Sequence, residues 1–177
     1  MSNSRIQLEK LSEADLLARC IWGEARGESI RGKLAVAHVV LNRVNARSYY
    51  GGSIKEVILK PLHFSCFNEN DPNLARILCL DSSNPDFAYC RAVADISLLA
   101  GNPDPTGGAT HYHAAGTRPS WVGSPQMKFL CQIGNHLFYR ESLSFRGMLL
   151  ALASRLFPSR QTGSQNSGAN KRNQEQE

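Results

Sequence analysis

The chain has 177 residues, of which 42% are hydrophobic and 20% charged, and its formal net charge is +5. This length and balance fit one globular domain with a tail. The chain is long enough and apolar enough to bury its own core. The modest positive excess suits an anionic partner such as nucleic acid, a membrane surface or a cell-wall polymer, without choosing among them.

The cysteines indicate reduced thiols in a cytosolic protein. They are odd in number and widely spaced, with no Cys-x-x-Cys motif, which argues against a disulfide framework or a zinc ribbon: Cys20, Cys66, Cys79, Cys90 and Cys131. The N-terminus is polar, and no segment reaches the roughly 18 apolar residues that a membrane span needs. We therefore expect a cytoplasmic protein without a signal peptide.

Helical signals dominate the first hundred residues. Ser12 can cap a helix whose apolar stripe leads to Glu24 and which ends at Gly27. Further helices are expected at about residues 29–45, 53–59, 71–80 and 85–100, the 53–59 helix being capped by Ser53 and stopped by Pro61. The Gly- and Pro-rich stretch 101–108 is expected to be a loop.

Extended segments are expected near His63–Phe67, at 109–113 and at about 128–131. On the 109–113 strand His111 and His113 share a face, because residues two apart on a strand point the same way. The 128–131 strand leads to residues 133–139, and a hairpin with the 109–113 strand is expected.

The composition changes after Tyr139. Four apolar residues then stand at helical spacing with two arginines among them: Phe145, Arg146, Leu149, Leu152, Arg155 and Leu156. This predicts a basic amphipathic helix over 144–157 that either packs on the domain or lies on an anionic membrane surface. Residues 1–140 are thus expected to form the folded domain, 141–158 the amphipathic helix, and 159–177 a disordered tail.

Glu24 is the first candidate for chemistry. A carboxyl group beside Ile21 and Trp22 loses contact with water, which favours its neutral, proton-donating form. On these residues alone a structural pairing with Arg26 or a more distant arginine remains open. Glu28 supplies a second carboxyl group, but a helix end at Gly27 means that the two need not share a face.

The histidines and aromatic residues form two further candidate groups. His111, His113 and His136, together with His63, have spacing that suits a metal, but no His-Glu-x-x-His motif accompanies them, and we interpret them as ligand-binding residues of a polar groove. Trp121 and Tyr112 have neighbours polar enough for a sugar-stacking cleft. Basic residues are scattered, so no nucleic-acid face is expected.

Several motifs in order resemble one known family. They are Ile21–Glu28, Gly32–Ala37, Leu41–Val44, Phe64-Ser65, Gly107–Ala109, Trp121 and Ile133–Tyr139. Together they are similar to the cell-wall hydrolases of the SleB/CwlJ type, the spore cortex-lytic enzymes and their bacterial and phage relatives. The resemblance covers roughly residues 16 to 139.

The resemblance implies an α+β fold, a mainly helical lysozyme-like transglycosylase domain with a small antiparallel sheet. It implies a lytic transglycosylase that cleaves peptidoglycan between N-acetylmuramic acid and N-acetylglucosamine, with no metal or cofactor. Glu24 matches the family's catalytic glutamate. Substrate-binding roles are expected for Glu28, Phe64, Ser65, His111, Tyr112, His113, Trp121 and His136, while Arg26 and Glu28 also hold the loop and the second helix.

The chain departs from the family pattern at His63, where Gln is usual, and at His111–Ala114, where aromatics and an Asn are usual. Without an export signal it resembles a phage or prophage endolysin, which is released to the wall through a separate membrane pore. Two other function classes remain open: a metal-dependent peptidoglycan amidase or peptidase that uses the histidines, and a non-catalytic wall-binding or virion protein.

Overall fold

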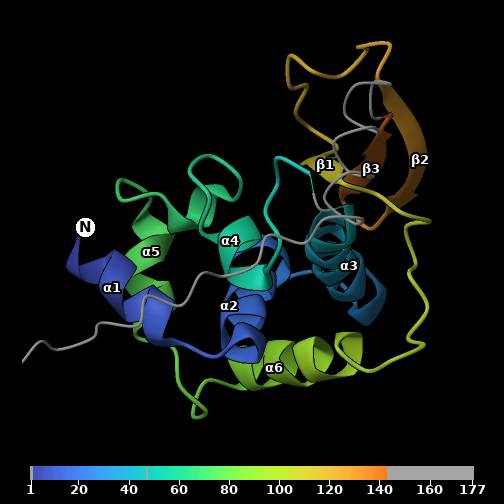
Figure 1. Ribbon diagram of the computed structural model, residues 1–177. Coiled ribbons are helices and arrows are strands. Elements are labelled where there is room, and N and C mark those ends of the chain that lie inside the picture. The colour runs from blue at the N-terminus through green and yellow to red at the C-terminus, as the bar shows by residue number, and fades with distance from the viewer. Residues whose placement is uncertain (1, 47, 143–177) are drawn as a thin grey trace, which may run out of the picture.

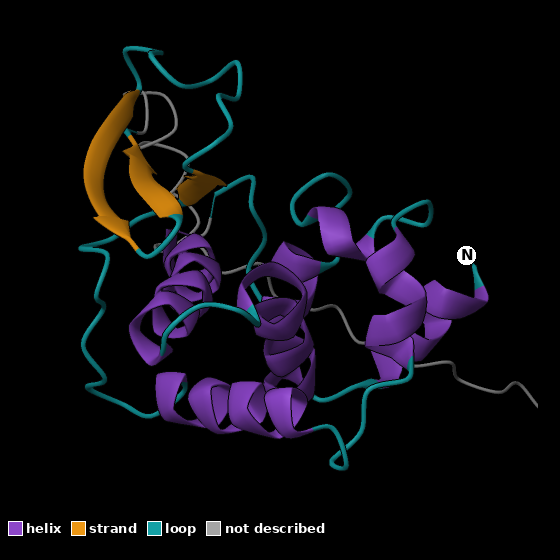
Figure 2. Cartoon of the chain, turned by 180° about the vertical axis from the view of Figure 1, so that it is seen from behind, coloured by secondary structure: helices purple, strands orange, loops and turns teal. Residues whose placement is uncertain are grey.

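The computed structural model describes residues 2–46 and 48–142. The helices are α1 (Asn3–Lys10), α2 (Glu13–Ala25), α3 (Ile30–Ala46), α4 (Ile54–Ile58), the 3-10 helix η1 (Ser65–Phe67), α5 (Pro72–Leu78) and α6 (Pro85–Ser97). The strands are β1 (His111–Ala114), β2 (Met127–Ile133) and β3 (His136–Glu141). The sheet lies beside α3, on the side of the molecule away from α1 (Figures 1 and 2).

Helix α2 is the axis of the helical part. It contacts α3, α4, α5 and α6, and the apolar stripe from Leu16 to Ile21 is fully buried in the main core. The Ser12 hydroxyl accepts a hydrogen bond from the Asp15 N–H and caps the helix. Because neighbours surround it, the last turn of α2 is held in a fixed place, and Glu24 lies in that turn.

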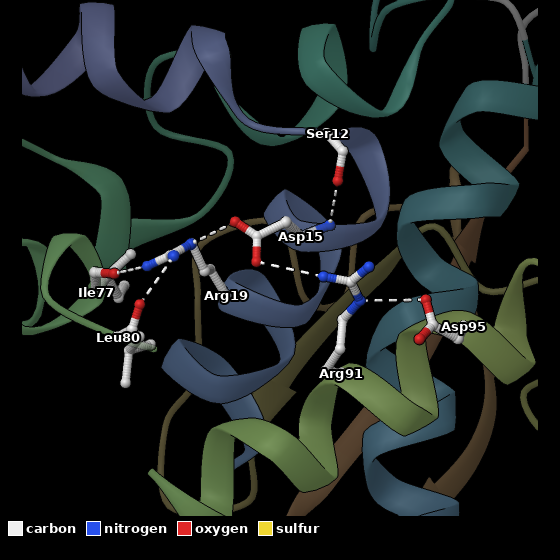
Figure 3. A network of polar contacts seen from close by, with 7 residues as sticks. All are labelled: Ser12, Asp15, Arg19, Ile77, Leu80, Arg91 and Asp95. Atoms are coloured by element: carbon white, nitrogen blue, oxygen red, sulfur yellow. Dashed lines mark hydrogen bonds and ion pairs between the residues drawn. The ribbon is translucent and has the colours of Figure 1, made fainter. Parts of the chain in front are cut away.

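A polar network secures the other end of α2 (Figure 3). The Asp15 carboxylate accepts a hydrogen bond from Arg19 Nε at 3.0 Å and pairs with Arg91 of α6 at 3.6 Å. The Arg19 guanidinium, which is 8% exposed, also donates to the backbone carbonyls of Leu80, at 3.0 Å, and Ile77. One buried arginine thus ties the end of α5 to α2, and Asp15 ties α6 to the same point.

The three strands form an antiparallel sheet in the order β1-β3-β2. Tyr112 lies opposite Phe138 and Ala114 opposite His136, so these residues share the face that packs on Ala35 of α3 through Phe138. His111 lies opposite Tyr139, on the other face. The sheet therefore presents Tyr112 and His136 toward the helices.

Most expected helices are confirmed, with Ser12 and Ser53 as N-caps. The prediction of an extended segment at His63–Phe67 was wrong. Ser65–Phe67 is a 3-10 helix, and the Phe64 and Cys66 side chains are buried in the helical core. Helix α1 was not predicted. The 109–113 strand does pair antiparallel, but with β3, a strand that the sequence did not indicate, and not with β2.

Within the described ranges no helix is long and apolar enough to cross a membrane. The five cysteines are free thiols. The amphipathic helix expected at 144–157 and the tail expected from 159 lie outside the described residues, so both, and the anionic-surface role of the helix, stay predictions.

Candidate active site

Glu24 and Tyr112 meet between the helices and the sheet. The Tyr112 hydroxyl donates a hydrogen bond to Glu24 Oε2 at 2.9 Å. Glu24 Oε1 is buried and has no hydrogen-bond partner among the described residues. Burial, followed by the nearby Glu24 carboxylate, raises the pKa of Tyr112, so the phenol keeps its proton and acts as the donor. One oxygen of Glu24 is therefore held by a hydrogen bond from Tyr112, while the other is buried between the helices and the sheet.

Helix α2 passes very close to η1 at Gly23, the residue before Glu24. A Cβ added at Gly23 would lie 2.6 Å from Cys66 Sγ, so only glycine permits this approach. The end of α2 is fixed by Lys33, whose Nζ donates to the Arg26 carbonyl at 2.8 Å, and the Arg26 guanidinium stacks 4.6 Å from the Trp22 ring centroid.

Glu28 and His136 lie beside this pair. The Asn135 N–H is 3.4 Å from each carboxylate oxygen of Glu28, and His136 Nδ1 is 3.9 Å from Glu28 Oε1. Burial lowers the pKa of His136 although Glu28 and Glu24 oppose the shift, so the imidazole is neutral near pH 7. Its ring meets that of Tyr112 edge-on, with centroids 5.1 Å apart, and its buried Nδ1 lacks a hydrogen-bond partner among the described residues.

His111, His113 and Trp121 form a separate cluster on the opposite face of the sheet. The Trp121 ring lies 5.3 Å from His111, 5.6 Å from His113 and 5.3 Å from Tyr139, centroid to centroid. Burial, followed by the charge of Arg43, lowers the pKa of His111 to about 4. The structure thus brings Tyr112 and His136 to Glu24, and it does not bring His111, His113 or Trp121 there.

This division also separates the histidines whose spacing in the sequence suits a metal. His111 and His113 face away from His136 across the sheet, so their ring nitrogens cannot converge on one ion. Over residues 2–46 and 48–142 no group of three or more His, Cys, Asp or Glu side chains is arranged to hold a metal.

Phe64 and Ser65 lie at the start of η1. The Phe64 side chain is 3% exposed and belongs to the helical core, where the Arg43 guanidinium covers its ring at 5.2 Å. Ser65 is exposed. The buried Phe64 ring is therefore not placed to contact a ligand directly, whereas Ser65 is accessible to one.

Sequence reasoning did not identify Lys33 and Asn135 as parts of the site, and it did not foresee the bond from Tyr112 to Glu24. The signal for Tyr112 was present in the strand period, since Tyr112 alternates with His111 and His113 and must face the other way. Nothing local marks Lys33 or Asn135, because each acts through contacts with the α2–α3 loop.

Comparison with known protein families shows which family the chain belongs to. Residues 27–139 match the model of the family described as Cell Wall Hydrolase. The chain belongs to the Cell Wall Hydrolase family. Among curated relatives of this family, it is 37% identical over 129 residues to a spore cortex-lytic enzyme of Halalkalibacterium halodurans and 35% identical over 130 residues to that of Bacillus subtilis. These alignments cover 72% and 70% of this chain, but only 34% and 36% of the relatives.

Solved structures of the Cell Wall Hydrolase relatives give the same fold. The catalytic domain of the Bacillus cereus SleB protein superposes with a TM-score of 0.57 at 27% identity, over 72% of this chain and 89% of that one. The catalytic domain of the germination-specific lytic transglycosylase SleB from Bacillus anthracis gives 0.51 at 27% identity, over 79% and 97%. The expected family and the helical fold with a small antiparallel sheet are both confirmed.

Proposed function

We propose that this chain cleaves the glycan strands of peptidoglycan as a lytic transglycosylase, at the bond between N-acetylmuramic acid and N-acetylglucosamine. One observation carries the proposal: Glu24 Oε2 is fixed by the Tyr112 hydroxyl, while the buried Oε1 has no hydrogen-bond partner among the described residues. A buried polar atom without a partner is costly, and a ligand group that bonds to it removes the cost. An oriented carboxyl oxygen at such a place is what a general acid needs.

The chemistry requires one carboxyl group. Glu24 protonates the glycosidic oxygen as its bond to C1 of the muramic acid breaks, and the leaving sugar departs as an alcohol. The Glu24 carboxylate then takes the proton of the C6 hydroxyl of the muramic acid, whose oxygen bonds to C1 and closes an anhydro ring. The proton is returned to Glu24, and no water is consumed.

The surroundings support a single-carboxyl mechanism over hydrolysis by a carboxyl pair. The Glu28 carboxylate is engaged with the Asn135 N–H at the β2–β3 turn. A hydrolytic pair would place a second free carboxylate across the bond, roughly 5 to 9.5 Å from the first. The lytic transglycosylase named among the solved relatives supports the same choice.

Substrate contacts follow from the same geometry. The His136 ring lies next to Glu28 and edge-on to Tyr112, so it borders the place where a sugar would meet Glu24. Ser65 is exposed at η1 and available to a ligand. The cluster on the opposite face of the sheet, His111, His113 and Trp121, lies away from Glu24. It can bind substrate only if the sugar chain is long enough to pass around the edge of the sheet.

The test is Glu24→Gln, which keeps the side-chain shape and removes the transferable proton. We expect no detectable release of soluble muropeptides from purified sacculi, with sedimentation binding to sacculi retained. Glu9→Gln on α1 is the matched control, because Glu9 is exposed and its carboxylate pairs only with Arg5 in the described structure. A chelator is expected to leave activity unchanged. Lysis by the Gln variant, or loss of lysis with EDTA and rescue by zinc, would contradict the proposal.

A further inference from the structure

We propose that Glu28 is a positioning residue, which clamps the β2–β3 turn to the end of α2 and thereby sets Tyr112 and His136 against Glu24. The inference rests on the proposed function, because it concerns how the groups around the proposed acid/base Glu24 are held in position. It gives Glu28 a role distinct from binding substrate and from transferring a proton.

The backbone and stem of Glu28 are fixed by helix α3. Lys33, which is 4% exposed, reaches back from α3, and its Nζ donates hydrogen bonds to the carbonyls of both Arg26 and Glu28. A Cβ added at Gly32 would lie 2.8 Å from the Glu28 Cβ, so the stem of Glu28 packs directly on the first turns of α3. The carboxylate therefore projects from a rigid base.

The carboxylate of Glu28 fits against the β2–β3 turn. Gly134 in that turn has a φ of +56°, and a Cβ added to it would lie 1.9 Å from Glu28 Oε2. The next residue, Asn135, directs its backbone N–H at both carboxylate oxygens. Only glycine combines this backbone conformation with this close approach. Carboxylate and turn are thus complementary in shape and in hydrogen bonding.

The turn is connected to Glu24 through two rings. Strand β3 starts at His136, whose Nδ1 lies 3.9 Å from Glu28 and whose ring packs edge-on against Tyr112 at 82° between planes. Tyr112 in turn donates to Glu24. The pairing of His136 with Ala114 fixes β1 to the start of β3, so a displaced turn moves Tyr112 away from Glu24.

This role requires an acceptor oxygen and the right side-chain length, and it does not require a proton. The Glu28 side chain is 16% exposed, and its oxygens face a backbone N–H. Glutamine keeps both the length and one acceptor oxygen. The geometry therefore separates Glu28→Gln, which should work, from Glu28→Ala, which should not.

The experiment compares these variants with the wild-type chain and Glu24→Gln, using soluble glycan strands and steady-state kinetics. Glu28→Ala is expected to lower kcat by roughly 10- to 100-fold with little change in KM, because a small misplacement of catalytic groups acts on the reaction step. Glu28→Gln should stay within about threefold of wild type. Glu56→Ala is the matched control, since Glu56 likewise accepts a backbone N–H, that of Gly52, in a turn of the helical part, and it should leave kcat and KM unchanged.

A double-mutant cycle makes the claim specific to the turn. Gly134→Asn, which tolerates the positive φ of this turn but adds a Cβ against Glu28 Oε2, should lower kcat in the wild-type chain but by no more than about twofold further in Glu28→Ala, because both changes break one contact. Independent, multiplying losses overturn the proposal, as does wild-type kcat in Glu28→Ala. Glu28→Gln as inactive as Glu24→Gln also overturns it, and this comparison stands even if Glu28→Ala does not fold. Inactivity of the wild-type chain on glycan strands overturns the proposed function instead.

Discussion

The two oxygens of Glu24 have unequal surroundings, and this asymmetry is the main residue-scale feature of the site. Oε2 receives the Tyr112 hydroxyl at 2.9 Å, and Oε1 is buried without a partner in the described structure. A hydrogen bond to an ionised acceptor is stronger than one between neutral groups. Tyr112 therefore orients the carboxyl group, and in the proposed reaction it stabilises the carboxylate that forms after proton donation.

Tyr112→Phe removes this donor and keeps the ring that packs against His136. We expect kcat to fall roughly tenfold or more, because a hydrogen bond to a charged group contributes about 1.5–3 kcal/mol. KM should change little, since Tyr112 acts on Glu24. Tyr89→Phe, on an exposed face of α6, is the matched control. Wild-type kcat in Tyr112→Phe would show that Glu24 needs no orienting donor.

At the scale of elements, local signals predicted the helices, and long-range contacts decided the rest. Ser12 and Ser53 cap helices through bonds to residues three positions on, which a sequence displays directly. Helix α1 buries only Leu8, so its polar sequence gave no apolar period. The bond from Tyr112 to Glu24 spans 88 residues, and no spacing rule reaches that far. The candidate acid was therefore predictable and its partner was not.

The contact between α2 and η1 gives a test at this scale. Gly23→Ala places a methyl group 2.6 Å from Cys66 Sγ and about 3.2 Å from an Ile77 methyl. We expect a loss of roughly 1–3 kcal/mol in the free energy of unfolding, as overpacked cores show, measured by urea denaturation. Gly27→Ala is the control, because a Cβ there meets no atom within 4 Å. Adding Cys66→Ala to Gly23→Ala should restore part of the loss, and failure to do so would place the strain elsewhere.

For the whole molecule, the buried histidines predict how stability depends on pH. Burial, and then Arg43, lowers the pKa of His111 from its ordinary 6.5 to about 4. Between these values the unfolded chain binds a proton that the folded chain does not, so stability should fall as pH falls through this window. The contribution vanishes above the ordinary pKa, where both states are neutral.

Urea denaturation at several pH values between about 4 and 7 measures how steeply stability depends on pH in this window. His111→Gln should flatten it, leaving the part contributed by His38, His63 and His136, whose pKa values are also lowered by burial. An unchanged slope in His111→Gln would contradict the assignment.

The most direct test of the central claim is the mass of the released fragments. Purified sacculi are digested with the chain, and the muropeptides are analysed by mass spectrometry without prior reduction. A lytic transglycosylase that uses Glu24 alone leaves anhydro-muramyl ends, each lighter by one water than a reducing end. We predict such ends from the wild-type chain and none from Glu24→Gln. Reducing ends would indicate hydrolysis with a second catalytic group, and free stem peptides with intact glycan strands would contradict glycosidic cleavage altogether.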